Sequence, residues 1–311
     1  MLVALDQGMI FALLALGVFL TYRILNMPDL TVDGSFTTGG GMAAILLTHG
    51  VHPVAATLAA AGAGALAGFV TATLHTRLRI EPLLASILTM IALWSINLRI
   101  MGKANLSMAG LDTLFSGLKE HKLLKTWVSV LILATLAILA KLLIDWFLAT
   151  DFGLAVQSTG DNPAMAASLG INTNTTKTVT LMISNALVGL AGGIQAQYQG
   201  FADISMGVGL ILVGLASVIV GNAILGTRYM FLASLGVIVG SVVYRLVIYF
   251  ALRWKVLDTG DMKLISAVLV VIALVVSQSP RVRTFFQRLS PYRAKEAPEP
   301  LLHIPKGGGE H

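Results

Sequence analysis

The chain has 311 residues, of which 56% are hydrophobic and only 12% are charged, and its mean hydropathy is +0.83. A soluble domain of this length could not bury so much apolar surface, so the composition indicates a protein that crosses a membrane several times. The absence of cysteine excludes disulfides and thiolate metal sites. The net charge of +6 reflects membrane topology rather than nucleic-acid binding, because much of it lies in the tail after Ser279.

Apolar segments long enough to cross a bilayer recur along the chain. We expect an all-α polytopic membrane protein with about 8–10 transmembrane helices, since about 20 apolar residues span the hydrocarbon core. The segments lie near residues 3–22, 36–49, 53–75, 82–101, 127–148, 178–198, 208–225, 229–251 and 262–278. The second and seventh are interrupted by glycine, which favours broken or half helices.

The chain divides into a transmembrane domain at 1–279 and a polar tail at 280–311, which we expect to be disordered. With the N-terminus outside, Arg23, Arg77 and the basic tail fall on one side of the membrane. Positive charge favours the cytoplasmic side, so we assign this side to the cytoplasm. Lys119 and its neighbouring lysines fall on the other side and count against the assignment.

A polar stretch at 157–172 lies between two apolar segments and carries its own helix signals. Asp161 or Asn162 can accept hydrogen bonds from the first-turn N–H groups, and Pro163 suits the first helical position. Gly170 can end the helix in the left-handed conformation. The pattern predicts a short helix at about 161–170 on the cytoplasmic side.

This short helix has an apolar face. Met165, Ala166 and Leu169 share it at helical spacing. A short amphipathic helix of this kind is suited to docking into a groove on another protein. The alternative is an ordinary helix lying in the membrane interface.

Two similar segments, Asp29–Ser35 and Asp203–Gly209, precede glycine-rich apolar stretches. The assigned topology places the first on the cytoplasmic side and the second outside, as an inverted repeat with broken helices would require. Acidic groups near membrane-embedded backbone are often functional, although each aspartate could instead cap a helix. The candidate residues for a solute path are Asp29, Thr31, Asp33, Ser35, Asp203 and Ser205.

Other polar residues in the spans have structural interpretations. Lys141 and Asp145 are four residues apart and are expected to pair. Asn185 and Gln197 can contact solute or bind neighbouring helices. The sequence holds no metal-ligand spacing, nucleophile elbow or Walker-type Gly-x-x-x-x-Gly-Lys, so we expect no enzyme, no metal and no cofactor bound by this chain. If ATP drives the protein, another chain must bind it.

These residues resemble the permease subunits of ABC importers for branched-chain amino acids and monosaccharides. The resemblance rests on Phe152–Gly153, Asp161–Ala167, Leu169–Asn172, Gly189–Gly193 and Gly207–Gly214. In that family, a cytoplasmic segment ending in a sequence like Leu-Gly-Ile-Asn docks on the ATPase. The resemblance therefore implies these ATPase-coupling residues: Asp161, Asn162, Met165, Leu169, Gly170 and Ile171.

Two further stretches, Tyr22–Phe36 and Leu88–Asn105, are similar to permeases described as tryptophan/tyrosine-type. Classical branched-chain permeases have Asn-Phe-Ala-His-Gly near the first stretch, whereas this chain has Pro28–Gly34. Their substrate is therefore not carried across to this chain.

The resemblance implies an importer subunit in the bacterial cytoplasmic membrane, surrounded by lipid, that moves an amino acid or similar small polar solute. It implies a second permease as homodimer or heterodimer partner, two copies of an ATPase that uses ATP and Mg²⁺, and an extracytoplasmic solute-binding protein. Two alternatives stay open. One is a secondary transporter with Asp29, Asp33 or Asp203 as its proton or Na⁺ site, and the other is an ABC efflux permease.

Overall fold

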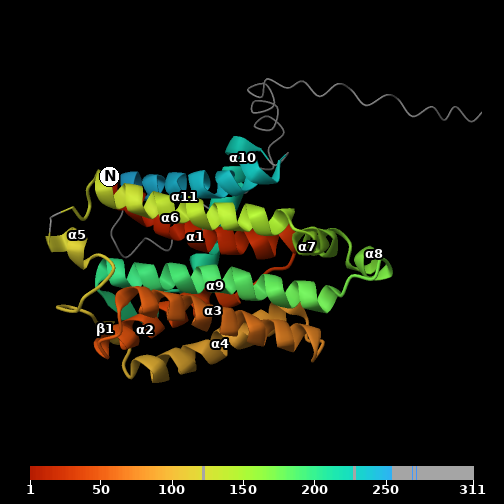
Figure 1. Cartoon of the computed structure of the whole chain (residues 1–311), viewed down its shortest axis with the longest axis horizontal. Coiled ribbons are helices and arrows are strands. Elements are labelled where there is room, and N and C mark those ends of the chain that lie inside the picture. The colour runs from red at the N-terminus through yellow and green to blue at the C-terminus, as the bar shows by residue number, and fades with distance from the viewer. Residues whose placement is uncertain (121–122, 227–228, 254–267, 269–270, 272–311) are drawn as a thin grey trace, which may run out of the picture.

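The computed structural model describes residues 1–120, 123–226, 229–253, 268 and 271, and within them the chain forms a bundle of helices (Figure 1). The predicted segment at 262–278 and the tail at 280–311 lie outside the described residues, apart from 268 and 271. The elements are α1 (Leu2–Val18), η1 (Phe19–Ile24), α2 (Thr31–Thr48), α3 (Pro53–Thr76), α4 (Pro82–Met101), β1 (Asn105–Ser107), α5 (Ser116–Glu120), α6 (Trp127–Ala149), α7 (Asp151–Asp161), α8 (Pro163–Ser168), α9 (Thr173–Gln199), β2 (Phe201–Asp203), α10 (Leu210–Leu225) and α11 (Met230–Arg253).

The all-α membrane architecture is confirmed. Six helical segments of the described chain are long and apolar enough to cross a membrane: Leu2–Ile24, Pro53–Thr76, Pro82–Met101, Trp127–Ala149, Thr173–Gln199 and Met230–Ala251. α10 is shorter, and α2 is rich in threonine and glycine, as the glycine-interrupted sequence indicates. α5, α7 and the antiparallel β1–β2 pair were not predicted.

The two ends of the bundle are different. The N-terminus, α5 and β1 lie at one end of the long axis, and α7 and α8 lie at the other (Figure 1). We call these the N-terminal end and the α8 end.

Several helices have a side-chain cap at their N-terminus, which accepts a hydrogen bond from a first-turn N–H group. Thr126 caps α6, Thr150 caps α7 and Asn172 caps α9.

α2 lies in the interior of the bundle, where it packs against α3, α4 and α9. Most of its residues are buried, including a run of three glycines. The close approach of these helices depends on small residues. A Cβ atom built at Gly39 would collide with the backbone of Gly189 on α9, and one built at Gly64 on α3 would collide with the carbonyl oxygen of Asn185. Backbones therefore touch directly at the centre of the bundle.

Gly62 and Gly64 of α3 provide a matched test of this packing. A Cβ at Gly62 meets no atom within 4 Å, so Gly62→Ala should leave stability unchanged or raise it by up to about 1 kcal/mol. Gly64→Ala must push α9 away and should cost about 1–3 kcal/mol. Thermal unfolding of the two variants in detergent measures the difference, and equal midpoints would contradict direct α3–α9 backbone contact.

Candidate functional site

The predicted short helix is α8, and its cap is Asn162. The Asn162 Oδ1 accepts hydrogen bonds from the backbone N–H groups of Ala164, at 3.1 Å, and Met165, at 3.0 Å. Pro163 stands at the first helical position. Asp161 is the last residue of α7 and does not cap α8. The structure therefore decides between the two cap candidates in favour of Asn162.

The exposed face of α8 consists of Met165 and Leu169, whose side chains are 48% and 69% exposed. Ala166 is fully buried, so its predicted place on the same face as Met165 and Leu169 is wrong. The helix ends as predicted, because Gly170 has a φ of +84°. The backbone N–H of Ile171 donates to the Ala166 carbonyl at 3.1 Å, which closes the C-terminal turn.

α8 is joined firmly to the bundle on both sides. The Asn172 Oδ1 accepts hydrogen bonds from the N–H groups of Asn174 and Thr175, so α9 begins directly after the α8 turn. The Thr159 hydroxyl of α7 lies 3.0 Å from the Thr176 hydroxyl of α9. Only a short turn therefore separates α8 from the long helix α9. The capping role of Asn172 follows from its place before a threonine-rich helix, but we did not predict it.

The Asp33 carboxylate binds the start of α10. Its Oδ2 accepts a hydrogen bond from the Gly209 N–H at 2.7 Å, and its Oδ1 accepts one from the Ile211 N–H at 2.8 Å. The Thr37 hydroxyl of α2 accepts a further bond from the Gly207 N–H at 3.1 Å. Asp33 was considered as a cap for its own helix, and this is wrong because its carboxylate instead caps α10.

Asp29, Thr31 and Ser35 form a closed polar network with Asn185 of α9. The Asp29 carboxylate accepts hydrogen bonds from the Thr31 N–H at 2.9 Å and the Asn185 Nδ2 at 2.7 Å. The Ser35 hydroxyl donates to the Asn185 Oδ1 at 2.7 Å. All of these side chains are buried. Asp29 therefore accepts a hydrogen bond from the first turn of α2. Asn185 joins α2 to α9, which is the second of the two roles that the sequence suggested for it.

Asp203 and Ser205 lie beside the β1–β2 pair. The Ser205 N–H donates to the Asp203 Oδ1 at 2.8 Å, and the Asn105 Nδ2 donates to its Oδ2 at 3.2 Å. Partial burial opposes ionisation of Asp203, but the hydrogen bonds from Ser205 and Asn105 outweigh it and hold the pKa of the carboxyl below its usual range. Ser205 is exposed.

The two repeated segments meet inside the protein. Asp203 lies in β2, whose partner strand β1 is at the N-terminal end of the bundle (Figure 1). The chain then turns inward, so that Gly207 and Gly209 reach Thr37 and Asp33 of α2. We expected the two segments to lie on opposite sides of the membrane. This is wrong for their C-terminal halves, because Asp33 of the first segment binds Gly209 of the second. We name the contact between α2 and residues 206–211 the α2–α10 seam.

Sequence reasoning missed a second buried carboxylate, Asp6 of α1. Its side chain accepts hydrogen bonds from the Ser129 hydroxyl of α6, at 3.0 Å, and the Tyr198 hydroxyl of α9, at 2.9 Å. An acidic residue inside the first apolar segment was the available signal. The Lys141–Asp145 pair was predicted correctly, with Nζ and Oδ2 2.6 Å apart.

Among the described residues, no group of three histidine or acidic side chains is placed to hold a metal ion. Asp29, Asp33 and Asn185 instead make hydrogen bonds to backbone groups and to neighbouring helices. The arrangement joins α2 to α9 and holds the first turn of α10 against α2.

Comparison with known proteins identifies the family of the chain. A model of the family described as "Branched-chain amino acid transport system / permease component" matches residues 1–276. The chain belongs to this family. It is the family of ABC importer permeases that the sequence resembles. No solved structure matches the chain.

Individual relatives carry consistent names. The chain is 42% identical to the tyrosine transport system permease protein of Clostridioides difficile, over 85% of this chain and 87% of the relative. It is 28% identical to a probable branched-chain amino acid transport permease protein of Methanocaldococcus jannaschii, over 68% and 70%. It is 30% identical to an autoinducer 2 import system permease protein of Escherichia coli, over 76% and 66%.

Asp33→Asn tests the attachment of α10 in this permease. An amide presents only one oxygen, so one N–H group of α10 loses its partner, and unfolding should become easier by about 1–3 kcal/mol. Amide hydrogen exchange at residues 209–212 should also become faster. Asp112→Asn, in an exposed loop, is the control and should change stability by less than about 0.5 kcal/mol. Unchanged exchange in the first turn of α10 would contradict the capping role.

Proposed function

We propose that the chain is the membrane-spanning subunit of a bacterial ABC importer in the cytoplasmic membrane. It works with a second permease, either a copy of itself or a related chain, and with two copies of a cytoplasmic ATPase. An extracytoplasmic binding protein delivers the solute. Family membership supports the transport role, and the six long apolar helices support the membrane location.

The observation that carries the proposal is α8. A helix of six residues at one end of a membrane bundle has its own asparagine cap, its own glycine stop and two large apolar side chains exposed. Helix formation by so short a segment requires such caps, since isolated short helices are unstable. Exposed Met165 and Leu169 provide apolar side chains to fill a groove on the ATPase.

ATP is bound and hydrolysed by the partner, which also holds the Mg²⁺, because this sequence has no Walker-type loop. Closure of the ATPase pair on ATP displaces α8. The bonds of Asn172 and Thr159 pass that displacement to α9. α9 packs along α2 and α3, so its movement changes the interior of the bundle where α2 meets α10.

The solute is an amino acid or a similar small polar molecule, and the relative named for tyrosine transport supports an aromatic amino acid. We place the path along the α2–α10 seam. Asp203 and Ser205 stand at its outer mouth, and Asp33 holds the half-helix α10 beside it. Asp29, Thr31 and Ser35 support the seam from the side of α9 and have their hydrogen bonds satisfied within the protein.

Replacement of Met165 and Leu169 by aspartate tests the coupling role. Gentle affinity purification of the chain from its native membrane should recover an ATPase subunit and ATP hydrolysis. The double variant should recover at least about tenfold less ATPase, because removal of two central apolar contacts costs more than 1.4 kcal/mol of binding free energy.

The control is Leu78→Asp. Leu78 follows α3 outside α8, and its side chain is 63% exposed. This variant should recover as much ATPase as the wild type. Wild-type protein that purifies without any ATPase, yet carries solute into vesicles lacking ATP, would contradict the proposed function.

A further inference from the structure

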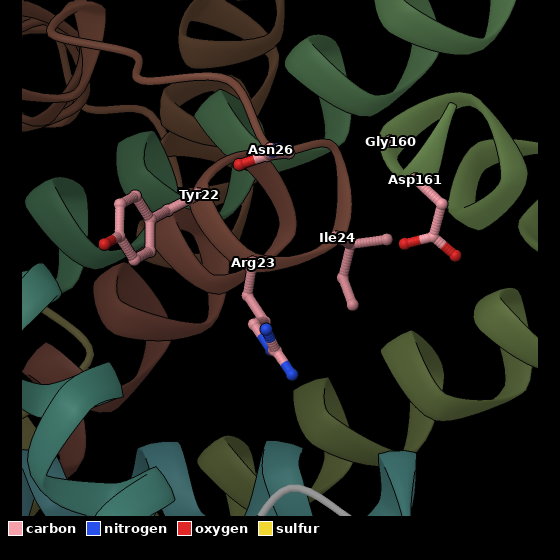
Figure 2. Close-up of a pocket in the computed structure, with 6 residues that line it drawn as sticks. All are labelled: Tyr22, Arg23, Ile24, Asn26, Gly160 and Asp161. Atoms are coloured by element: carbon pink, nitrogen blue, oxygen red, sulfur yellow. The ribbon is translucent and has the colours of Figure 1, made fainter. Parts of the chain in front are cut away.

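A polar pocket of about 260 Å³ opens between the end of the first span and the end of α7. Its lining residues are Tyr22, Arg23, Ile24, Asn26, Gly160 and Asp161. Figure 2 shows the Arg23 guanidinium and the Asp161 carboxylate extending from different elements, with Ile24 between them. Asp161 is followed directly by Asn162, the cap of α8. The pocket therefore adjoins the proposed docking helix.

The two walls of this pocket are in direct backbone contact. A Cβ atom at Gly160 would collide with the Ile24 carbonyl oxygen, so the last turn of α7 lies directly against the end of η1. The first span ends here in a π-helical stretch, and Asn26 beyond it has a φ of +52°. π-helical turns such as η1 are frequent at functional sites. A residue other than glycine in the left-handed region, such as Asn26, is uncommon.

The two charges in the pocket are of opposite sign and are not used within the described part of the protein. The ion pair found among the described residues joins Lys141 to Asp145. Arg23 and Asp161 are both exposed. A guanidinium can bind a carboxylate through two parallel hydrogen bonds, and a carboxylate can accept from a basic group. The pocket thus complements a partner that presents an acid beside a base.

We propose that this pocket is a second docking point for the ATPase, in which an acidic side chain of the ATPase binds Arg23 and a basic one binds Asp161. The inference rests on the proposed function. The ATPase is the expected occupant because Asp161 is followed directly by the cap of α8, and α7 and α8 lie at the same end of the bundle. A free amino acid, which also carries both charges, is the competing occupant.

The consequence is a direct connection between the ATPase and the first span. α8 passes movement to α9, whereas Arg23 lies in the last turn of the span formed by α1 and η1. α1 packs against α6, α9, α10 and α11. Force applied at Arg23 would therefore reach α10 through α1, and α10 is the helix held by Asp33 at the seam.

Single charge reversals test the pocket. The ATPase that co-purifies with the wild type is identified, co-expressed with each variant and quantified by ATP hydrolysis and band intensity. Arg23→Glu and Asp161→Lys should each lower recovered ATPase by about tenfold, as loss of a desolvated interfacial charge pair does. The matched controls are Arg77→Glu and Asp151→Lys, which make the same charge changes on exposed residues outside the pocket. The controls should recover wild-type amounts.

The double reversal Arg23→Asp with Asp161→Arg distinguishes two explanations of a low recovery. One is lost binding to the ATPase, and the other is lost attraction between residues 23 and 161 within the permease. The double reversal keeps both charges in the pocket but exchanges their places, so each ATPase side chain meets a like charge and recovery stays low. Restored recovery would overturn the proposal. Thermal unfolding is measured for every variant. A lowered unfolding midpoint would show that the permease itself is destabilised and that this causes the low recovery of ATPase.

Three further outcomes are decisive. Free tyrosine that raises the unfolding midpoint of the wild type but not of Arg23→Glu would place a small solute in the pocket and overturn the proposal. If Arg23→Glu recovers as much ATPase as Arg77→Glu, the pocket is not a docking point, and the proposed function still stands. If the wild type itself recovers no ATPase, the proposed function fails first.

Discussion

The arrangement of this permease depends on one capping interaction inside the bundle. α10 begins within the protein, and backbone N–H groups at membrane depth must find partners there because lipid offers none. The Asp33 carboxylate supplies them for Gly209 and Ile211. A negative charge at a helix N-terminus is also favoured by the helix dipole. This interaction fixes the start of α10 against α2, and the seam between them is where we propose that the interior opens.

The surroundings of the seam are built for close contact and few voids. Glycines let α2, α3 and α9 touch through their backbones, while Asp29 and Asn185 join α2 to α9 by hydrogen bonds. Such packing transmits small displacements, since dense interiors deform little. In the proposed mechanism, a movement that begins at α8 reaches α2 through α9. The proposed docking at Arg23 would add a second route to the seam through the first span.

Local signals in the sequence predicted much of this structure, and long-range contacts explain what they missed. The cap, proline and glycine that define α8 are neighbours in the chain, and the apolar spans are continuous. The partner of Asp33 could not be foreseen, because the contact with Gly209 joins residues 176 positions apart, and Asp-Gly-Ser equally fits a local cap. Asp6 meets Ser129 over 123 positions for the same reason. Ala166 was misplaced because its neighbours in space come from other helices.

The α2–α10 seam can be tested directly because the chain has no cysteine. A Cβ atom at Gly40 would lie 2.7 Å from the Met206 Sδ, so these two positions are in contact across the seam, and Gly40→Cys with Met206→Cys is the pair for cross-linking it. The measurement is ATP-driven solute uptake into proteoliposomes that contain the double variant and its ATPase, before and after oxidation. We expect the disulfide to stop uptake and a reducing agent to restore it. Full uptake by completely cross-linked protein would contradict a path that opens at this seam.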